Sequence, residues 1–90
     1  MQSLINEISV ALEAYRKATT ESGDVKATED FSRLIVITEK IVAAIQTGDI
    51  TQAKLSLLGF SRQVSDSFAV QPLEFGLLAK KVAKLRKLVI

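Results

Sequence analysis

The chain has 90 residues, enough for one compact domain and too few for two. Hydrophobic residues make up 48% of it, with four Phe, one Tyr and no Trp, and this mainly aliphatic mixture favours packed helices over a β-sandwich. His and Cys are absent, which excludes disulfides and thiolate metal sites and removes the most common general base and zinc ligands. We therefore expect a single domain over residues 1–90, without a metal or cofactor.

The net charge of +2 conceals a difference between the two halves of the chain. Residues 1–49 carry eight acidic and five basic side chains, a net charge of −3, whereas residues 50–90 carry two acidic and seven basic side chains, a net charge of +5. The basic character therefore belongs mainly to the last predicted helix, which contains Lys80, Lys81, Lys84, Arg86 and Lys87.

The first predicted helix spans residues 3–18, and Ser3 is its expected N-cap. The polar segment 19–24, which contains Gly23, is predicted to be a loop. Apolar residues recur along one face of this helix at the spacing expected for 3.6 residues per turn. They are Leu4, Ile5, Ile8, Ala11, Leu12 and Tyr15.

The second predicted helix spans residues 28–46, with Thr28 as N-cap and two acidic residues after it that complement the helix dipole. Three of the four residues in the run 34–37 are β-branched, which is typical of a strand, but the helical period continues on both sides of the run and favours a helix. The inward stripe consists of Phe31, Leu34, Ile35, Thr38, Ile41, Val42 and Ile45.

The segment Thr47-Gly48-Asp49 predicts a tight turn between two antiparallel helices. Gly48 suits the left-handed position that ends a helix, and Asp49 suits the next N-cap, with Gln52 placed to close a capping box. The third helix is predicted over residues 50–68. Its inward stripe consists of Ile50, Ala53, Leu57, Phe60, Val64 and Phe68.

Gly59 interrupts the third helix at a cost of about 1 kcal/mol relative to Ala. We expect it to allow a close helix crossing, and a kink is the alternative. Pro72 is predicted to start the fourth helix, because proline is tolerated in the first turn. On this helix, Leu78, Val82, Leu85 and Val89 point to one side and the lysines to the other. The four segments together predict an all-α, antiparallel four-helix bundle.

Motifs for catalysis are missing from the sequence. The four glycines match neither a dinucleotide-binding nor a phosphate-binding loop. Glu29 and Asp30 form the only pair of adjacent acidic residues, and their position is typical of a helix start. Carboxylates and hydroxyls alone leave no activated nucleophile that the sequence can identify. We therefore predict no catalytic residue and no enzymatic activity.

The basic fourth helix has two interpretations. One is a solvated face with no partner. The other is a surface that contacts anionic lipid headgroups or an acidic partner, because each Lys or Arg contributes about 1 kcal/mol near an anionic membrane. Interleaved aromatics, Asn or Gln for base edges, and helix-turn-helix spacing are lacking, which argues against nucleic acid. The candidate partner-binding or membrane-surface residues are Lys80, Lys81, Lys84, Arg86 and Lys87.

A family resemblance covers most of the chain and rests on four segments. They are Leu4-Ile5-Asn6-Glu7-Ile8 with Tyr15, the loop at 19–27, Lys40-Ile41-Val42-Ala43-Ala44-Ile45-Gln46-Thr47-Gly48-Asp49, and Gln71-Pro72-Leu73. In helix length and loop placement the chain resembles the immunity proteins that protect lactic acid bacteria and streptococci from pediocin-like bacteriocins, of the enterocin A immunity type.

The resemblance implies a cytosolic four-helix bundle without enzymatic activity. Such proteins recognise the bacteriocin once it has engaged its membrane receptor, the mannose permease of the sugar phosphotransferase system, and they block the lethal pore. The C-terminal part selects the bacteriocin in that family. The implied partner is the bacteriocin-bound membrane permease complex.

A second hypothesis is a helical adaptor or secretion-type chaperone, whose bundle would offer an apolar groove to a partner helix. A stable monomer in solution would favour the immunity protein, and a dimer would favour the adaptor. The sequence has no apolar run near the length of about 18 residues that a membrane span needs, and no signal peptide at its N-terminus. We expect a cytoplasmic protein, with peripheral contact at the inner face of the membrane.

Overall fold

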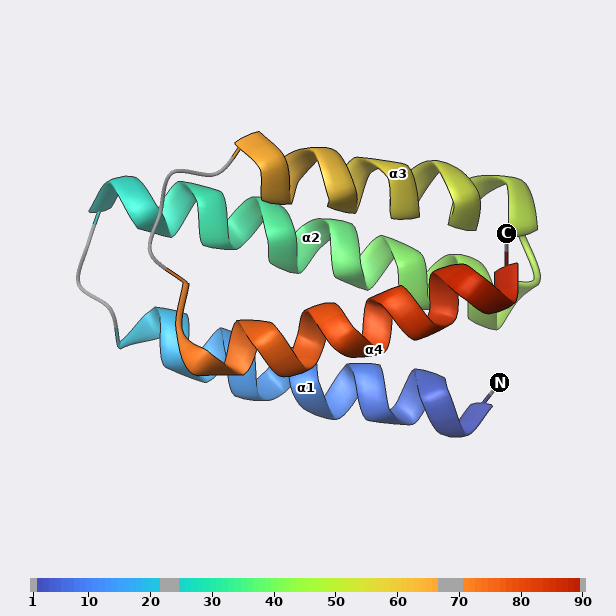
Figure 1. Cartoon of the computed structure of the whole chain (residues 1–90), viewed down its shortest axis with the longest axis horizontal. Helices are drawn as coiled ribbons and strands as arrows, with labels where there is room; N and C mark the ends of the chain where they lie inside the picture. Colours follow the sequence, from blue (N-terminus) through green and yellow to red (C-terminus); the bar gives the residue numbers. More distant parts are fainter. Residues whose placement is uncertain (1, 22–24, 67–70, 90) are drawn as a thin grey trace.

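The computed structural model describes residues 2–21, 25–66 and 71–89, and within these ranges the regular structure consists of four α-helices. Consecutive helices run antiparallel, and the two ends of the chain lie at the same end of the molecule (Figure 1). The predicted all-α, antiparallel four-helix bundle is confirmed. The helices are α1 (Gln2–Thr20), α2 (Val25–Thr47), α3 (Ile50–Asp66) and α4 (Leu73–Val89).

The first two helices begin earlier than predicted. Ser3 lies inside α1, which already includes Gln2, and Thr28 lies inside α2, which begins at Val25. Neither residue is therefore the N-cap that its type suggested. The predicted loop residues 22–24 and the predicted end of the third helix, residues 67–68, lie outside the described part of the chain.

Two threonines that were predicted to be in a loop instead extend α1. The hydroxyl of Thr19 donates a hydrogen bond to the carbonyl oxygen of Tyr15 at 3.0 Å, and the hydroxyl of Thr20 donates to that of Arg16 at 2.8 Å. Each hydroxyl thus bonds within the helix one turn back, which satisfies the polar side chain without ending the helix. Local polarity alone was a poor guide to where α1 ends.

The turn between α2 and α3 has the predicted left-handed glycine. Gly48 adopts a φ of 78°. Its amide donates to the carbonyl oxygen of Ile45 at 3.2 Å, and the amide of Asp49 donates to that of Ala44 at 2.9 Å. This pair of bonds is a Schellman motif, which satisfies two of the carbonyls that a helix C-terminus leaves free.

Asp49 is the N-cap of α3, as predicted. Its Oδ1 accepts a hydrogen bond from the amide of Gln52 at 3.0 Å. The predicted capping box is wrong, because the side-chain amide of Gln52 donates to the hydroxyl of Ser56 at 3.3 Å instead of reaching back to Asp49. The turn is fixed by one side-chain bond and the backbone of Gly48.

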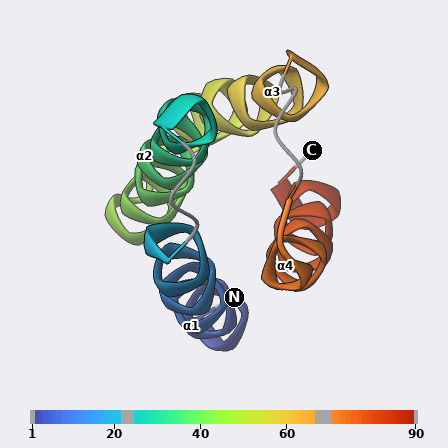
Figure 2. The same cartoon turned by 90° about the vertical axis from the view of Figure 1, so that its left-hand side faces the viewer.

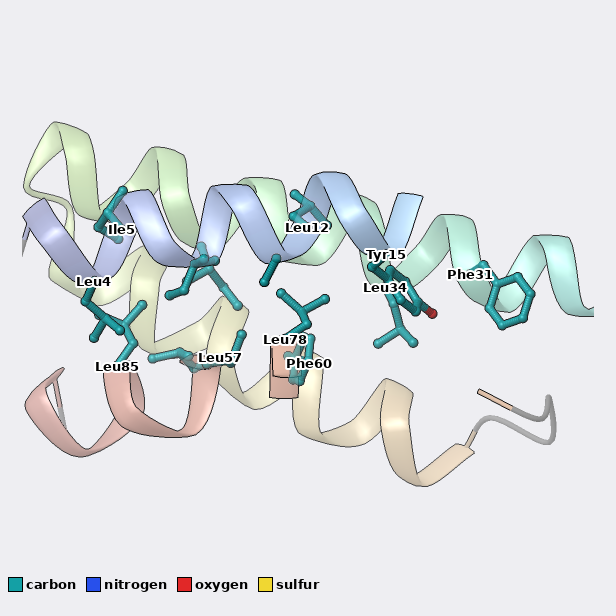
Figure 3. Packing of buried hydrophobic residues seen from close by; sticks show 14 residues of the cluster. Leu4, Ile5, Leu12, Tyr15, Phe31, Leu34, Leu57, Phe60, Leu78 and Leu85 are labelled. Carbon is teal, nitrogen blue, oxygen red and sulfur yellow. The ribbon is translucent and has the colours of Figure 1, made fainter. Parts of the chain in front are cut away.

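Each helix packs on two neighbours, α1 on α2 and α4, and α3 on the same two. Viewed from one end, α1, α2 and α3 form an arc and α4 lies between its two ends (Figure 2). The core fills the space inside this ring (Figure 3). Its buried cluster comprises Leu4, Ile5, Ile8, Ala11, Leu12, Tyr15, Phe31, Leu34, Ile41, Leu57, Phe60, Leu78, Val82 and Leu85.

The predicted stripes match this core in most positions. Ile41 and Leu57 are almost completely buried in the central hairpin, as expected for facing stripes. Ile50 departs from its stripe, because it is 47% exposed at the first position of α3, beyond the reach of the core.

The close helix crossing predicted at Gly59 is also wrong. A Cβ placed on Gly59 would meet no atom within 4 Å, so no neighbouring helix comes close to its backbone. Gly59 therefore gives the unfolded chain extra conformational freedom and makes no close packing contact in the folded state.

We predict that replacing either Ile41 or Leu57 with alanine lowers the free energy of unfolding by about 2–5 kcal/mol, because each change opens a cavity in a packed core. Urea unfolding of the variants measures this loss. Val10 is an exposed aliphatic residue on α1, and Val10→Ala is the control, expected to change stability by less than about 0.5 kcal/mol. Losses below ~1 kcal/mol at both core positions would show that the wrong face had been assigned to the core.

Gly59→Ala should raise the free energy of unfolding by roughly 0.5–1 kcal/mol, because it adds helix propensity where space is open. Gly48→Ala should lower it by roughly 1 kcal/mol, since φ at that position favours glycine. The same urea titration compares both variants with the wild type. Equal effects of the two substitutions would contradict the difference in backbone geometry.

Candidate interaction surface

The inward face of α4 is the one that the sequence predicted. Leu78, Val82 and Leu85 are buried in the common core, and Val89 packs partly buried against it. The helix begins directly after Pro72, whose carbonyl oxygen accepts a hydrogen bond from the amide of Phe75 at 3.0 Å. These contacts decide which side of α4 is left for solvent.

Tyr15, on α1, contacts both α2 and the start of α4. Its hydroxyl donates a hydrogen bond to Oε1 of Gln71 at 2.8 Å, just before α4. Its ring lies 6.1 Å from that of Phe75 on α4 and 6.1 Å from that of Phe31 on α2, the latter edge-to-face at 84°. Figure 3 shows Tyr15 and Phe31 in the core. Such aromatic pairs contribute about 0.5–1.5 kcal/mol beyond burial.

A second contact holds the middle of α4 to α1. The ammonium of Lys81 lies 3.1 Å from Oε1 of Glu7, and the Lys81 side chain is only 23% exposed. The lysines were predicted to point away from the apolar stripe, and Lys81 departs from an outward position because it faces Glu7 of α1. The packing of α1 beside α4 brings a carboxylate opposite it, which the local sequence of α4 does not reveal.

The five predicted site residues thus fall into three groups. Lys80, Lys84 and Lys87 are exposed, and among the described residues no carboxylate forms an ion pair with them. Lys81 faces α1. Arg86 is exposed but faces α3, where its Nη1 donates to the hydroxyl of Ser61 at 3.3 Å. Three of the five therefore form an outward basic face.

Three leucines on this face were missed by the sequence analysis. Leu73, Leu77 and Leu88 are 95%, 53% and 64% exposed. They follow the spacing of the outward lysines along α4, and a helical wheel of the whole segment, rather than of its buried stripe alone, would have placed them there. We call the six exposed residues the Leu–Lys face; they are Leu73, Leu77, Lys80, Lys84, Lys87 and Leu88.

A hollow lies within this face. It has a volume of about 470 Å³ and is lined by Leu77, Lys80, Lys81 and Lys84. A leucine beside three lysine side chains suits an anionic group that is attached to an apolar chain. Because Lys81 is already paired with Glu7, Lys80 and Lys84 are the two cations left to meet such an anion.

A separate apolar groove runs between α3 and α4, the most sparsely packed of the neighbouring helix pairs. Its volume is about 290 Å³, and its lining includes Arg86 and Ser61, which are joined by a hydrogen bond. Its apolar walls consist of Leu57, Phe60, Val64, Phe75, Ala79, Val82 and Ala83.

The described ranges contain no group of three or more acidic side chains placed to hold a metal ion. In the same part of the chain, no helix is both long and apolar enough to cross a bilayer. No protein-family model matches the chain, and neither the curated proteins nor the solved structures contain a match. The physical features of α4 are therefore the observations from which a function can be argued.

Burial of its phenol raises the pKa of Tyr15 to about 12. In the unfolded chain the phenol of Tyr15 ionises at a pH of about 10. In the folded protein it stays neutral up to a pH of about 12. The stability that this difference provides is therefore complete below pH 10 and is lost as the pH rises from 10 to 12.

We predict a phenolate absorbance titration with a midpoint near 12 in the folded protein, and Tyr15 is the only tyrosine in the chain that can give this signal. Tyr15→Phe should lower stability by about 1 kcal/mol through loss of one hydrogen bond, and its stability should fall less steeply between pH 10 and 12. The comparison with Tyr15→Phe removes the contribution of the lysines, which titrate in the same range. A midpoint near 10 in the native protein would contradict the buried position of the ring.

Proposed function

We propose that this protein is a bacteriocin immunity protein. It would protect the cell that makes it from a pediocin-like bacteriocin, acting from the cytosol on the complex of bacteriocin and membrane permease. The observation that supports this best is the outward basic face of α4, where Lys80, Lys84 and Lys87 are free to meet an anionic surface. The four helices also form a bundle of the kind that the resemblance implies.

The proposed mechanism requires binding and no chemical step. Anionic lipids give the cytoplasmic leaflet a negative potential, which attracts clustered cations within about one Debye length. The lysines of α4 would thus concentrate the protein at the inner face of the membrane, where a poisoned permease is found. Shape contacts near the C-terminal end would then select the bacteriocin-bound permease and block its pore.

Reversal of two of these charges tests the proposal. Lys80→Glu combined with Lys84→Glu should leave the far-UV circular dichroism spectrum unchanged, because both side chains are exposed. The same change should reduce survival of a sensitive strain treated with the cognate bacteriocin, at matched expression. Each lysine near an anionic membrane contributes about 1 kcal/mol, so the double variant should lose at least tenfold of its membrane association.

The matched control is Lys17→Glu with Lys54→Glu. These two lysines are exposed on α1 and α3, and their reversal changes the net charge by the same amount. Protection should persist in this control. Undiminished protection by the α4 variant, with an unchanged spectrum in both proteins, would leave its lysines as a solvated face and remove the electrostatic part of the proposal.

The α3–α4 groove favours a second candidate, a helical adaptor or secretion-type chaperone that accepts a partner helix. The groove is apolar and lies between the two helices that pack least closely. Solution mass separates the two proposals, since a stable monomer favours the immunity protein and a dimer favours the adaptor.

A further inference from the structure

Leucines and lysines share one continuous strip of α4. At about 100° per residue, Leu73, Leu77, Lys80, Lys84 and Leu88 fall within a sector of roughly 80°. The strip is roughly 22 Å long, from the first turn of the helix to the last. Both residue types are therefore presented to the same partner along nearly the whole helix.

The leucines of the strip have no function in the fold. Leu73, Leu77 and Leu88 are all more than half exposed, while the core contacts of α4 are made by residues on its opposite side. Exposed aliphatic side chains that recur on one helix face mark a surface that binds another apolar phase or molecule. Because lysines alternate with these leucines, the partner must accept both apolar and cationic side chains.

That interleaving fits a lipid surface better than a protein. The buried centre of a protein interface is depleted in lysine, because the ammonium would lose its hydration there. In a bilayer interface, a lysine stem can lie along the apolar boundary while its charged end reaches the phosphates. Interfacial helices accordingly combine Leu with Lys and lie in the plane of the headgroups.

We propose that the Leu–Lys face docks the protein on an anionic phospholipid bilayer. Leu73, Leu77 and Leu88 enter the boundary between headgroups and acyl chains, and Lys84 and Lys80 bind a lipid phosphate in the hollow beside Leu77. This inference rests on the proposed function in that it names the surface and the lipid chemistry by which the protein reaches the membrane. It adds an apolar, salt-resistant component to the attraction between charges.

Flotation with phosphatidylcholine vesicles, with and without phosphatidylglycerol, tests the docking. The wild type should bind vesicles that contain phosphatidylglycerol, and part of this binding should persist in salt concentrations that screen the lysines. The variant Leu73→Ser/Leu77→Ser/Leu88→Ser should partition at least about tenfold more weakly, because it loses the apolar component. Lys80→Glu/Lys84→Glu should abolish the preference for phosphatidylglycerol.

The matched control is Val10→Ser/Leu55→Ser/Leu58→Ser. These residues are also exposed, but they lie on α1 and α3, and Leu55 lines a hollow together with Ile37 of α2. The control removes as many exposed aliphatic side chains as the test variant and should bind vesicles within about twofold of the wild type. Equal losses in both variants would show that general hydrophobicity, and not the Leu–Lys face, governs binding, and would overturn the proposal.

A fluorescent residue tests insertion directly. The chain contains no Trp, so Leu77→Trp introduces a single indole on the face and Leu55→Trp places one on α3. Emission of the first should shift to the blue on addition of anionic vesicles, and emission of the second should not. The absence of a shift at position 77, with binding retained, would show contact by charge alone and overturn the insertion of the leucines.

These experiments need neither bacteriocin nor permease, so they separate the two proposals. Absence of vesicle binding overturns the docking and leaves the immunity function to be judged by survival. Vesicle binding without protection by the wild type against any bacteriocin tested overturns the immunity function and leaves the docking in place. Binding of soluble polyglutamate without binding of vesicles would assign the face to an acidic protein and overturn the choice of a bilayer.

Discussion

The buried side chain of Tyr15 determines how the last helix sits on the rest of the bundle. It contacts Phe31 on α2 and Phe75 on α4, and its hydroxyl bonds Gln71 at the entrance to α4. A phenol removed from water destabilises the fold unless its hydroxyl finds a partner. Because that partner lies immediately before α4, the hydrogen bond holds in place the segment from which α4 begins.

The rotation of α4 about its axis follows from this constraint. Phe75 is held at one end, the pair of Lys81 with Glu7 holds the middle against α1, and Leu85 anchors the last turns in the core. A partly exposed ion pair adds little to stability. The side of α4 that faces away from these contacts carries both the exposed lysines and the exposed leucines.

The bundle is tighter on one side than on the other. The Gly48 turn connects α2 to α3 through a closed set of backbone bonds, and these two helices pack closely along their length. The contact between α3 and α4 is sparse and leaves an apolar groove, across which Arg86 reaches Ser61. Both candidate binding features therefore belong to α4, one on its outer side and one where it faces α3.

The sequence by itself determined the four helices, the turn at Gly48 and Asp49, and core positions such as Ile41 and Leu57. These features depend on periodicity and backbone preference within short windows, which one segment encodes alone. Only the tertiary structure decided that Lys81 is paired, because Glu7 lies 74 residues away, and that Gly59 faces open space. It also decided that Leu73, Leu77 and Leu88 stay exposed beside the lysines, since the burial of an apolar side chain depends on which helices pack against it and not on its own chemistry.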